Sequence, residues 1–185
     1  MAESASVLAG WSTFFATMCT SDAALIGLMF VVITLVAGME RRQPTRDGLS
    51  TYSSPNVMHF CGALFVSAVL IAPWHSLLGA DVTIGLGALY GIAYSVRVIF
   101  RAWQTAAKSA VQSEGSSYTP DLEDWMWYTI MPFVGYCAIV GGAVVLSRSP
   151  APALYAVAAG VLLLTFVGIR NAWDVVTYLT VIEGP

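Results

Sequence analysis

Charged residues are scarce in this chain of 185 residues, and lysine is almost absent. Only 10% of the residues are Asp, Glu, Lys or Arg, whereas soluble domains carry about 25%. The single lysine is Lys108, and no basic run is longer than Arg41-Arg42. With a net charge of −3, the chain lacks the basic surface that binds nucleic acid, so we expect no nucleic-acid partner.

Residues with metal-binding or redox spacing are also missing. Cys19, Cys61 and Cys137 form no CxxC pair and lie among apolar neighbours, which is typical of small buried side chains. His59 and His75 lie 16 residues apart on one expected helix, about 24 Å of rise, so they cannot share a haem or a metal ion. We expect no metal and no cofactor.

Enzyme motifs are absent as well. The sequence contains no Walker loop, HExxH, GxSxG or dinucleotide fingerprint. A retinal-type Schiff base needs a lysine within a membrane span, and Lys108 lies beyond one. The motifs therefore give no positive argument for an enzyme.

Hydrophobic residues, in contrast, make up 57% of the chain. A soluble domain of this length has room for one modest core, so lipid must solvate much of this surface. A crossing takes about 20 residues, and backbone groups in lipid must be satisfied within their own helix. We predict one domain, residues 1–185, that is an all-α polytopic transmembrane helix bundle. Its five expected spans are about 15–38, 56–75, 82–103, 125–147 and 151–172, with helix continuing to about 182. Four spans plus a shorter or tilted first helix is the alternative.

Prolines suggest two local features of these helices. Ser54-Pro55 is typical of an N-cap and a first-turn proline, so it predicts the start of the second helix. Pro132 lies inside the fourth span, where it should kink the helix and free the carbonyl of Tyr128.

The distribution of basic residues predicts the orientation of the chain. Loops rich in Lys and Arg stay in the cytoplasm, and only Arg148 falls on the side opposite to the other basic residues. The residues on or near the first side are Arg41, Arg42, Arg46, Arg97, Arg101, Lys108 and Arg170. We therefore expect the N-terminus outside and the C-terminus in the cytoplasm.

Polar residues are expected to gather at the cytoplasmic ends of the second, third and fifth spans. Charged groups inside spans are costly and therefore informative, and Asp174 follows Arg170 at i+4, where opposite charges meet. The expected cluster contains His59, Arg97, Arg101, Arg170, Asn171 and Asp174. It is either an ion-paired network that fixes packing and topology or a ligand, lipid or proton site.

Asp22 and His75 are the polar residues expected toward the outer leaflet. Asp22 has no basic neighbour in the sequence, and His75 closes the second helix. An unpaired carboxylate within a span could exchange protons. If the first helix ends at Gly38, however, Asp22 lies near the interface and is solvated.

Small residues recur every four positions on the third helix, at Thr83, Gly87, Gly91 and Ser95. This spacing contains a GxxxG motif and predicts a face that packs closely on another helix. The partner helix is either in the same chain or in another subunit, which leaves a homo-oligomer or a membrane partner protein open.

Several segments resemble a group of small bacterial integral membrane proteins that have no assigned activity. The segments are AALIGLMFVVITL, His59-Phe60, APWHS, Glu123-Asp124-Trp125 with Pro132 and Tyr136, and Asn171-Ala-Trp-Asp174. In that group a histidine precedes NAWD, whereas this chain has Arg170. The resemblance implies a membrane architecture, located in a bacterial inner membrane, and it implies no substrate.

Three functions compete at this point. The first is a bundle that passes or binds a small ion, proton or solute through a polar path. The second is an accessory or scaffold subunit that uses the small-residue helix face and the loop from Gln104 to Asp124. The third is an intramembrane enzyme, with Asp22, His75 or Asp174 as the acid-base group.

Overall fold

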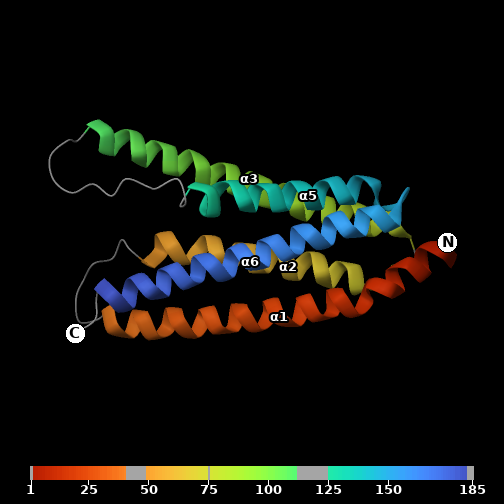
Figure 1. The fold of residues 1–185 in the computed structure, drawn as a ribbon, viewed down its shortest axis with the longest axis horizontal. Coiled ribbons are helices and arrows are strands. Elements are labelled where there is room, and N and C mark those ends of the chain that lie inside the picture. The colour runs from red at the N-terminus through yellow and green to blue at the C-terminus, as the bar shows by residue number, and fades with distance from the viewer. Residues whose placement is uncertain (1, 41–48, 75, 112–124, 183–185) are drawn as a thin grey trace.

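A computed structural model describes residues 2–40, 49–74, 76–111 and 125–182 of the chain. The described part contains five helices and no strand, which confirms the expected all-α bundle. Its elements are α1 (Ala2–Glu40), α2 (Leu49–Ile71), α3 (Leu77–Val111), the π-helical turn η1 (Met126–Ile130) continued by α5 (Met131–Leu146), and α6 (Pro150–Ile182). Successive helices run in opposite directions, so α1 begins and α6 ends at opposite ends of the bundle (Figure 1).

Four of the described helices are long and apolar enough to cross a membrane. The crossing segments are Ser6–Leu35, Leu77–Arg101, Met126–Leu146 and Pro150–Asp174. The apolar part of α2, Asn56–Ile71, is shorter. The alternative of four spans plus one different helix therefore fits these lengths, but the shorter apolar helix is α2 and not the first helix, since α1 has 39 residues, about 58 Å of rise.

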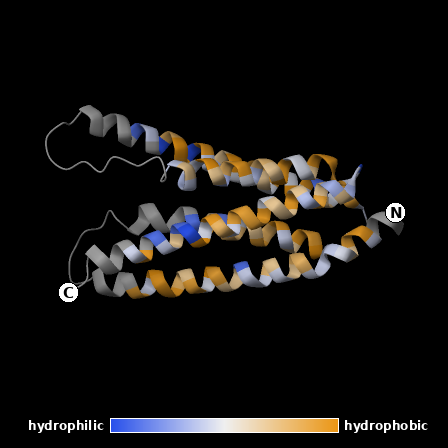
Figure 2. Ribbon diagram, in the orientation of Figure 1, coloured by the Kyte–Doolittle hydropathy of each residue, from blue (hydrophilic) through white to orange (hydrophobic). Residues whose placement is uncertain are grey.

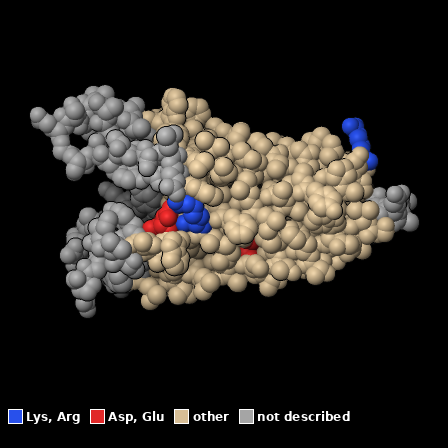
Figure 3. Space-filling view, viewed as in Figure 1, with Lys and Arg blue, Asp and Glu red and all other residues tan. Residues whose placement is uncertain are grey.

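The outer surface of the bundle is apolar along most of its length. Large hydrophobic side chains are exposed on every long helix, among them Phe30, Leu86, Val144 and Phe166. Hydrophobic residues fill most of the middle of the bundle in Figure 2, and in Figure 3 charged side chains lie toward its two ends, apart from one small acidic patch between them. Such a surface suits lipid rather than water, so the chain is a membrane protein.

The second helix begins and ends at residues other than those expected. It starts at Leu49, so the predicted start at Ser54-Pro55 was wrong. It ends at Ile71 because Pro73 has no N–H to continue the helical ladder. The Trp74 indole N–H donates instead to the carbonyl of Val69, at 2.6 Å, which is the acceptor that residue 73 would otherwise use.

The fourth helix opens with a wider turn before its proline. Within η1 the backbone N–H of Met131 donates to the carbonyl of Met126, a spacing of five residues typical of π-helix. Pro132 follows at the start of α5. The proline therefore lies in the first turn of a regular α-helix, where its missing N–H is tolerated.

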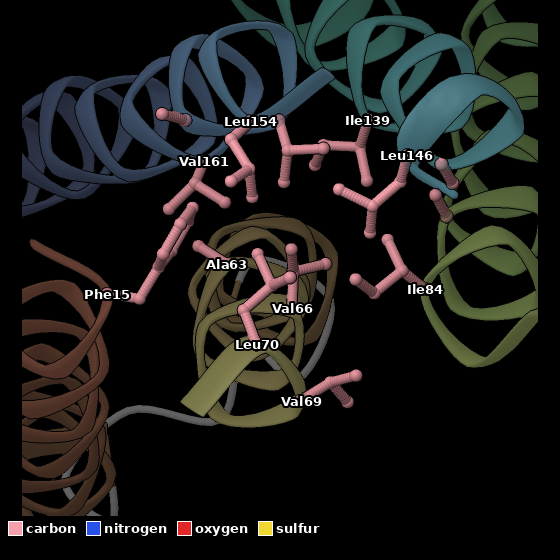
Figure 4. Packing of buried hydrophobic residues seen from close by; sticks show 14 of the residues in the cluster. Phe15, Ala63, Val66, Val69, Leu70, Ile84, Ile139, Leu146, Leu154 and Val161 are labelled. Carbon is pink, nitrogen blue, oxygen red and sulfur yellow. The ribbon is translucent and has the colours of Figure 1, made fainter. Parts of the chain in front are cut away.

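The apolar core lies between α2 and the helices around it. Figure 4 shows side chains from α1, α3, α5 and α6 pointing toward α2, among them Phe15, Ile84, Leu146 and Val161. The α5–α6 pair packs backbone to backbone. A Cβ added at Gly160 would lie 2.7 Å from the carbonyl oxygen of Gly135, so this approach requires glycine.

Candidate functional site

A fully buried carboxylate lies between α1 and α6. Asp22 has no exposed surface, and its Oδ1 accepts a hydrogen bond from Thr165 Oγ1 at 2.9 Å. The same hydroxyl lies 3.0 Å from the carbonyl oxygen of Val161, so its one proton has two acceptors. Asp22 Oδ2 is also buried and has no hydrogen-bond partner among the described residues. This arrangement does not compensate a full negative charge on the carboxylate.

The expectation of a solvated Asp22 was wrong, because its side chain has no exposed surface. The first helix was expected to begin near residue 15, but α1 begins at Ala2. The apolar stretch Ser6–Leu35 therefore has Asp22 close to its middle. A charged group at that depth in a membrane costs several kcal/mol unless something compensates it.

A second polar pair joins α2 to α5. His59 Nδ1 lies 3.4 Å from the Tyr136 hydroxyl, which in turn donates to the carbonyl of Met58 at 3.3 Å. Both side chains are 2% exposed. The hydroxyl proton has two acceptors, the Met58 carbonyl and an unprotonated Nδ1; when Met58 accepts it, a protonated Nδ1 can donate to the hydroxyl oxygen.

The Tyr136 ring occupies a slot between two glycines. A Cβ added at Gly91 of α3 would lie 2.2 Å from Tyr136 Cε1, and one added at Gly62 of α2 would lie 2.8 Å from its hydroxyl oxygen. A Cβ at Gly87 would similarly lie 2.5 Å from the Phe65 ring of α2. The GxxxG face of α3 therefore receives aromatic rings from its own chain.

The other two residues of this face bond within their own helix. Thr83 Oγ1 donates to the carbonyl of Gly79 at 2.7 Å, and the buried Ser95 Oγ donates to that of Gly91 at 2.9 Å. Such bonds satisfy a hydroxyl without a partner from another helix. The face contributes packing rather than polar groups to the interior.

Two buried carboxamides flank the crossing of α2 and α6. Asn56 and Asn171 have no exposed surface. Neither amide atom of Asn56 has a partner among the described residues, and the same holds for Asn171 Oδ1. Asn171 Nδ2 donates to the carbonyl of Trp127 at 3.4 Å. These three buried polar atoms need a partner beyond the described residues, because leaving them bare is costly.

The expected six-residue cluster is only partly assembled. Arg170 forms an ion pair with Asp174 on α6, and its guanidinium carbon lies 5.3 Å from the centroid of the Trp127 ring. Arg97 and Arg101 are exposed on α3, and their expected place in the cluster stays a prediction. The buried face of α3 carries Ala88, Gly91 and Ser95 instead.

One predicted polar residue is not described by the structure, and two observed ones were not predicted. His75, predicted with Asp22 as an outer polar residue, lies outside the described residues. Sequence reasoning missed Thr165 and Asn56, which are neutral and sit in ordinary apolar surroundings. Asn56 had one usable signal, since it precedes His59 by three residues and therefore shares its helix face.

The described residues contain no group of three or more His, Cys, Asp or Glu side chains that could hold a metal ion. Comparison of the chain with models of protein families, with curated proteins and with solved structures found no match. The resemblance to the bacterial membrane proteins therefore stays a prediction. The function must be argued from the residues themselves.

Proposed function

We propose that this membrane protein binds and exchanges a proton at Asp22. The observation that carries the proposal is the buried carboxylate itself, with one oxygen bonded to Thr165 and the other without a partner among the described residues. An ionised carboxylate in an apolar interior must be paired, neutralised or bound to a cation. A single hydroxyl partner fulfils none of these needs.

A proton suits this site better than a metal cation. A metal ion held by oxygen atoms takes about six or more ligands, whereas the Thr165 hydroxyl is the hydrogen-bonding partner that the structure gives Asp22. A proton needs only the carboxylate oxygen. The unpartnered Oδ2 is the atom that we propose to carry it.

Charged and titratable groups lie near Asp22 on α6 and on α2. The charged pair Arg170 and Asp174 begins five residues beyond Thr165 on α6, about 7.5 Å of rise. Arg170 is paired there with Asp174, while Asp22 Oδ2 has no hydrogen-bond partner among the described residues. On α2 the thiol of Cys61 lies close enough to interact electrostatically with Asp22.

The proposed setting is a bacterial inner membrane with the N-terminus outside. Arg97, Arg101 and Arg170 lie toward the end of the bundle where α3 and α6 finish, and Arg148 lies at the opposite end. Basic residues favour the cytoplasmic side. The end of the bundle near Arg170 is therefore assigned to the cytoplasm.

The experiment is a site-resolved titration by nuclear magnetic resonance. Protein labelled with ¹³C at aspartate carboxyls is reconstituted in lipid, and the Asp22 signal is assigned by its loss in Asp22→Asn. We expect this signal to move with pH and to show a deuterium isotope shift, which reports a bound proton. An Asp22 signal that is constant with pH and lacks the isotope shift would refute the proposal.

Asp81 provides the matched control for this titration. It is also a buried aspartate with one oxygen, Oδ1, that has no partner among the described residues, but it lies at the start of α3 and its Oδ2 accepts a backbone N–H, that of Ser147 at 3.2 Å. In Asp81→Asn protein we expect the Asp22 signal to titrate as in the wild type. A changed Asp22 curve in that variant would mean that the two carboxyls share one titration.

The alternatives receive less support from the geometry. The scaffold hypothesis relied partly on the small-residue face, which Phe65 and Tyr136 fill, and its loop residues 112–124 lie outside the described residues. An enzyme using Asp22 with Asp174 would need both near one atom. Thr165 and Asp174 are nine residues apart on α6, about 13 Å, so they form no such pair.

A further inference from the structure

Buried polar side chains are concentrated on one side of Asp22. Toward the end of the bundle where α2 begins, the buried polar residues are Asn56, His59, Ser95, Thr129 and Asn171. Toward the other end, the described interior has Ser67 and then Asp81 at the start of α3. The remaining side chains there form the apolar core of Figure 4. The polarity of the interior is therefore asymmetric about Asp22.

Asn56 and Asn171 occupy matching positions on two antiparallel helices. A Cβ added at Gly168 of α6 would meet the Phe60 ring of α2 at 2.6 Å, so these two positions face each other. Asn56 lies one turn before Phe60 and Asn171 about one turn after Gly168. Because the helices run in opposite directions (Figure 1), both carboxamides lie on the same side of this contact.

The unpartnered atoms at this crossing have the chemistry that binds water. They comprise two carbonyl oxygens, which accept, and one amide nitrogen, which donates. A buried water typically makes two to four hydrogen bonds to such groups. The groups are neutral, so they attract neither an anion nor a cation in preference to water.

The polarity of α6 on either side of Thr165 also favours this route to Asp22. Thr165, which bonds Asp22, lies six residues from the buried Asn171, about 9 Å along α6. In the other direction α6 presents the buried apolar side chains of Val161, Val157 and Leu154. The more polar route thus leads through the crossing.

We propose that water occupies the Asn56–Asn171 crossing and supplies the proton of Asp22 from the end of the bundle where α2 begins. The inference rests on the proposed function for the proton, but the bound water rests on the unpartnered carboxamides alone. Transfer of the proton to the opposite end would require the apolar core to open.

The test is thiol labelling of single-cysteine variants in membranes. Cys19, Cys61 and Cys137 are first replaced by alanine, and Asn171→Cys and Asn56→Cys are then treated with a small, water-soluble methanethiosulfonate, which reacts with hydrated thiolates. Val157→Cys and Ala63→Cys are matched controls, because they are fully buried on the same two helices. We expect modification at the two asparagine positions, from the α2-start side of the membrane, and none at the controls.

The outcomes separate the two proposals. Absence of modification at Asn171→Cys and Asn56→Cys, or equal modification at the controls, would overturn the water site while leaving the titration of Asp22 unaffected. Modification limited to the asparagine positions, together with an Asp22 signal that does not titrate, would support the water site and refute proton binding.

A second measurement covers the case in which the asparagine variants do not fold. In radiolytic footprinting of the native chain, bound water generates hydroxyl radicals that oxidise adjacent side chains. We expect oxidation of Phe60, which lies one turn from Asn56 on the same face of α2, and protection of Phe15 in the apolar core, although both rings are 1% exposed. Equal oxidation of the two phenylalanines would overturn the water site.

Discussion

Replacing Gly91 by alanine tests whether the small-residue face of α3 packs within the chain. The added Cβ would lie 2.2 Å from Tyr136 Cε1, 2.4 Å from Cδ1 and 2.6 Å from Cζ. Carbon atoms in contact need about 3.5 Å, so the ring would have to move by about 1.3 Å. Such a shift disturbs the hydroxyl contacts with His59 and Met58, at 3.4 and 3.3 Å.

The expected cost of Gly91→Ala follows from these contacts. Overpacking costs about 1–3 kcal/mol, and the loss of a buried hydrogen bond adds about 0.5–1.5 kcal/mol. Alanine is otherwise favoured over glycine in a helix by roughly 0.5–1 kcal/mol. The net loss in the free energy of unfolding should therefore be about 1–3 kcal/mol, measured by denaturant titration in micelles.

Gly141 on α5 supplies the matched control. A Cβ added there has no atom within 4 Å, so Gly141→Ala should be neutral or slightly stabilising. Replacing the Tyr136 ring by a leucine side chain should relieve the clash. We therefore expect Gly91→Ala to lower the free energy of unfolding less in a Tyr136→Leu background than in the wild type. A neutral Gly91→Ala, or a cost that appears only when subunits associate, would refute intramolecular packing of this face.

Three further predictions concern the polar groups. Thr165→Val should lower the free energy of unfolding by about 1–3 kcal/mol. The loss should be smaller in an Asp22→Leu background, which lacks the carboxyl. Equal losses in both backgrounds would mean that the hydroxyl does not stabilise the carboxyl. Tyr136→Phe should cost about 0.5–1.5 kcal/mol and shift the ring resonances of His59, and unchanged resonances would contradict their contact. Asp174→Asn should lower the free energy of unfolding by less than about 1 kcal/mol in a denaturant titration, because its ion pair with Arg170 is partly exposed. A larger loss would mean that the pair is buried in lipid.

Apolar patterning was sufficient to predict the helices but not their ends. Each long apolar run forms a helix, because the backbone N–H and C=O groups of a membrane span must hydrogen-bond within their own segment. The early start of α1 was missed because its first turns contain several polar residues. Those turns are stabilised by tertiary packing, in which Trp11 contacts Tyr155 of α6 with ring centroids 4.8 Å apart. Sequence periodicity does not report such a contact.

The site was predicted residue by residue, but its pairings were not. Asp22, His59 and Asn171 stood out because polar groups are rare in apolar runs. Their partners depend on how each helix is rotated about its axis. The Thr165 hydroxyl can also donate to the carbonyl of Val161 within its own helix, so nothing in the sequence marks Thr165 as the partner of Asp22.

Proton uptake by the reconstituted protein tests the proposed role of Asp22 most directly. A pH-indicator dye would count the protons bound when vesicles that contain the wild type or Asp22→Asn are brought from alkaline to acidic pH. We expect the wild type to bind about one proton more per chain than the variant, because only it retains the exchangeable carboxyl. Equal uptake by the two proteins would contradict a proton site at Asp22.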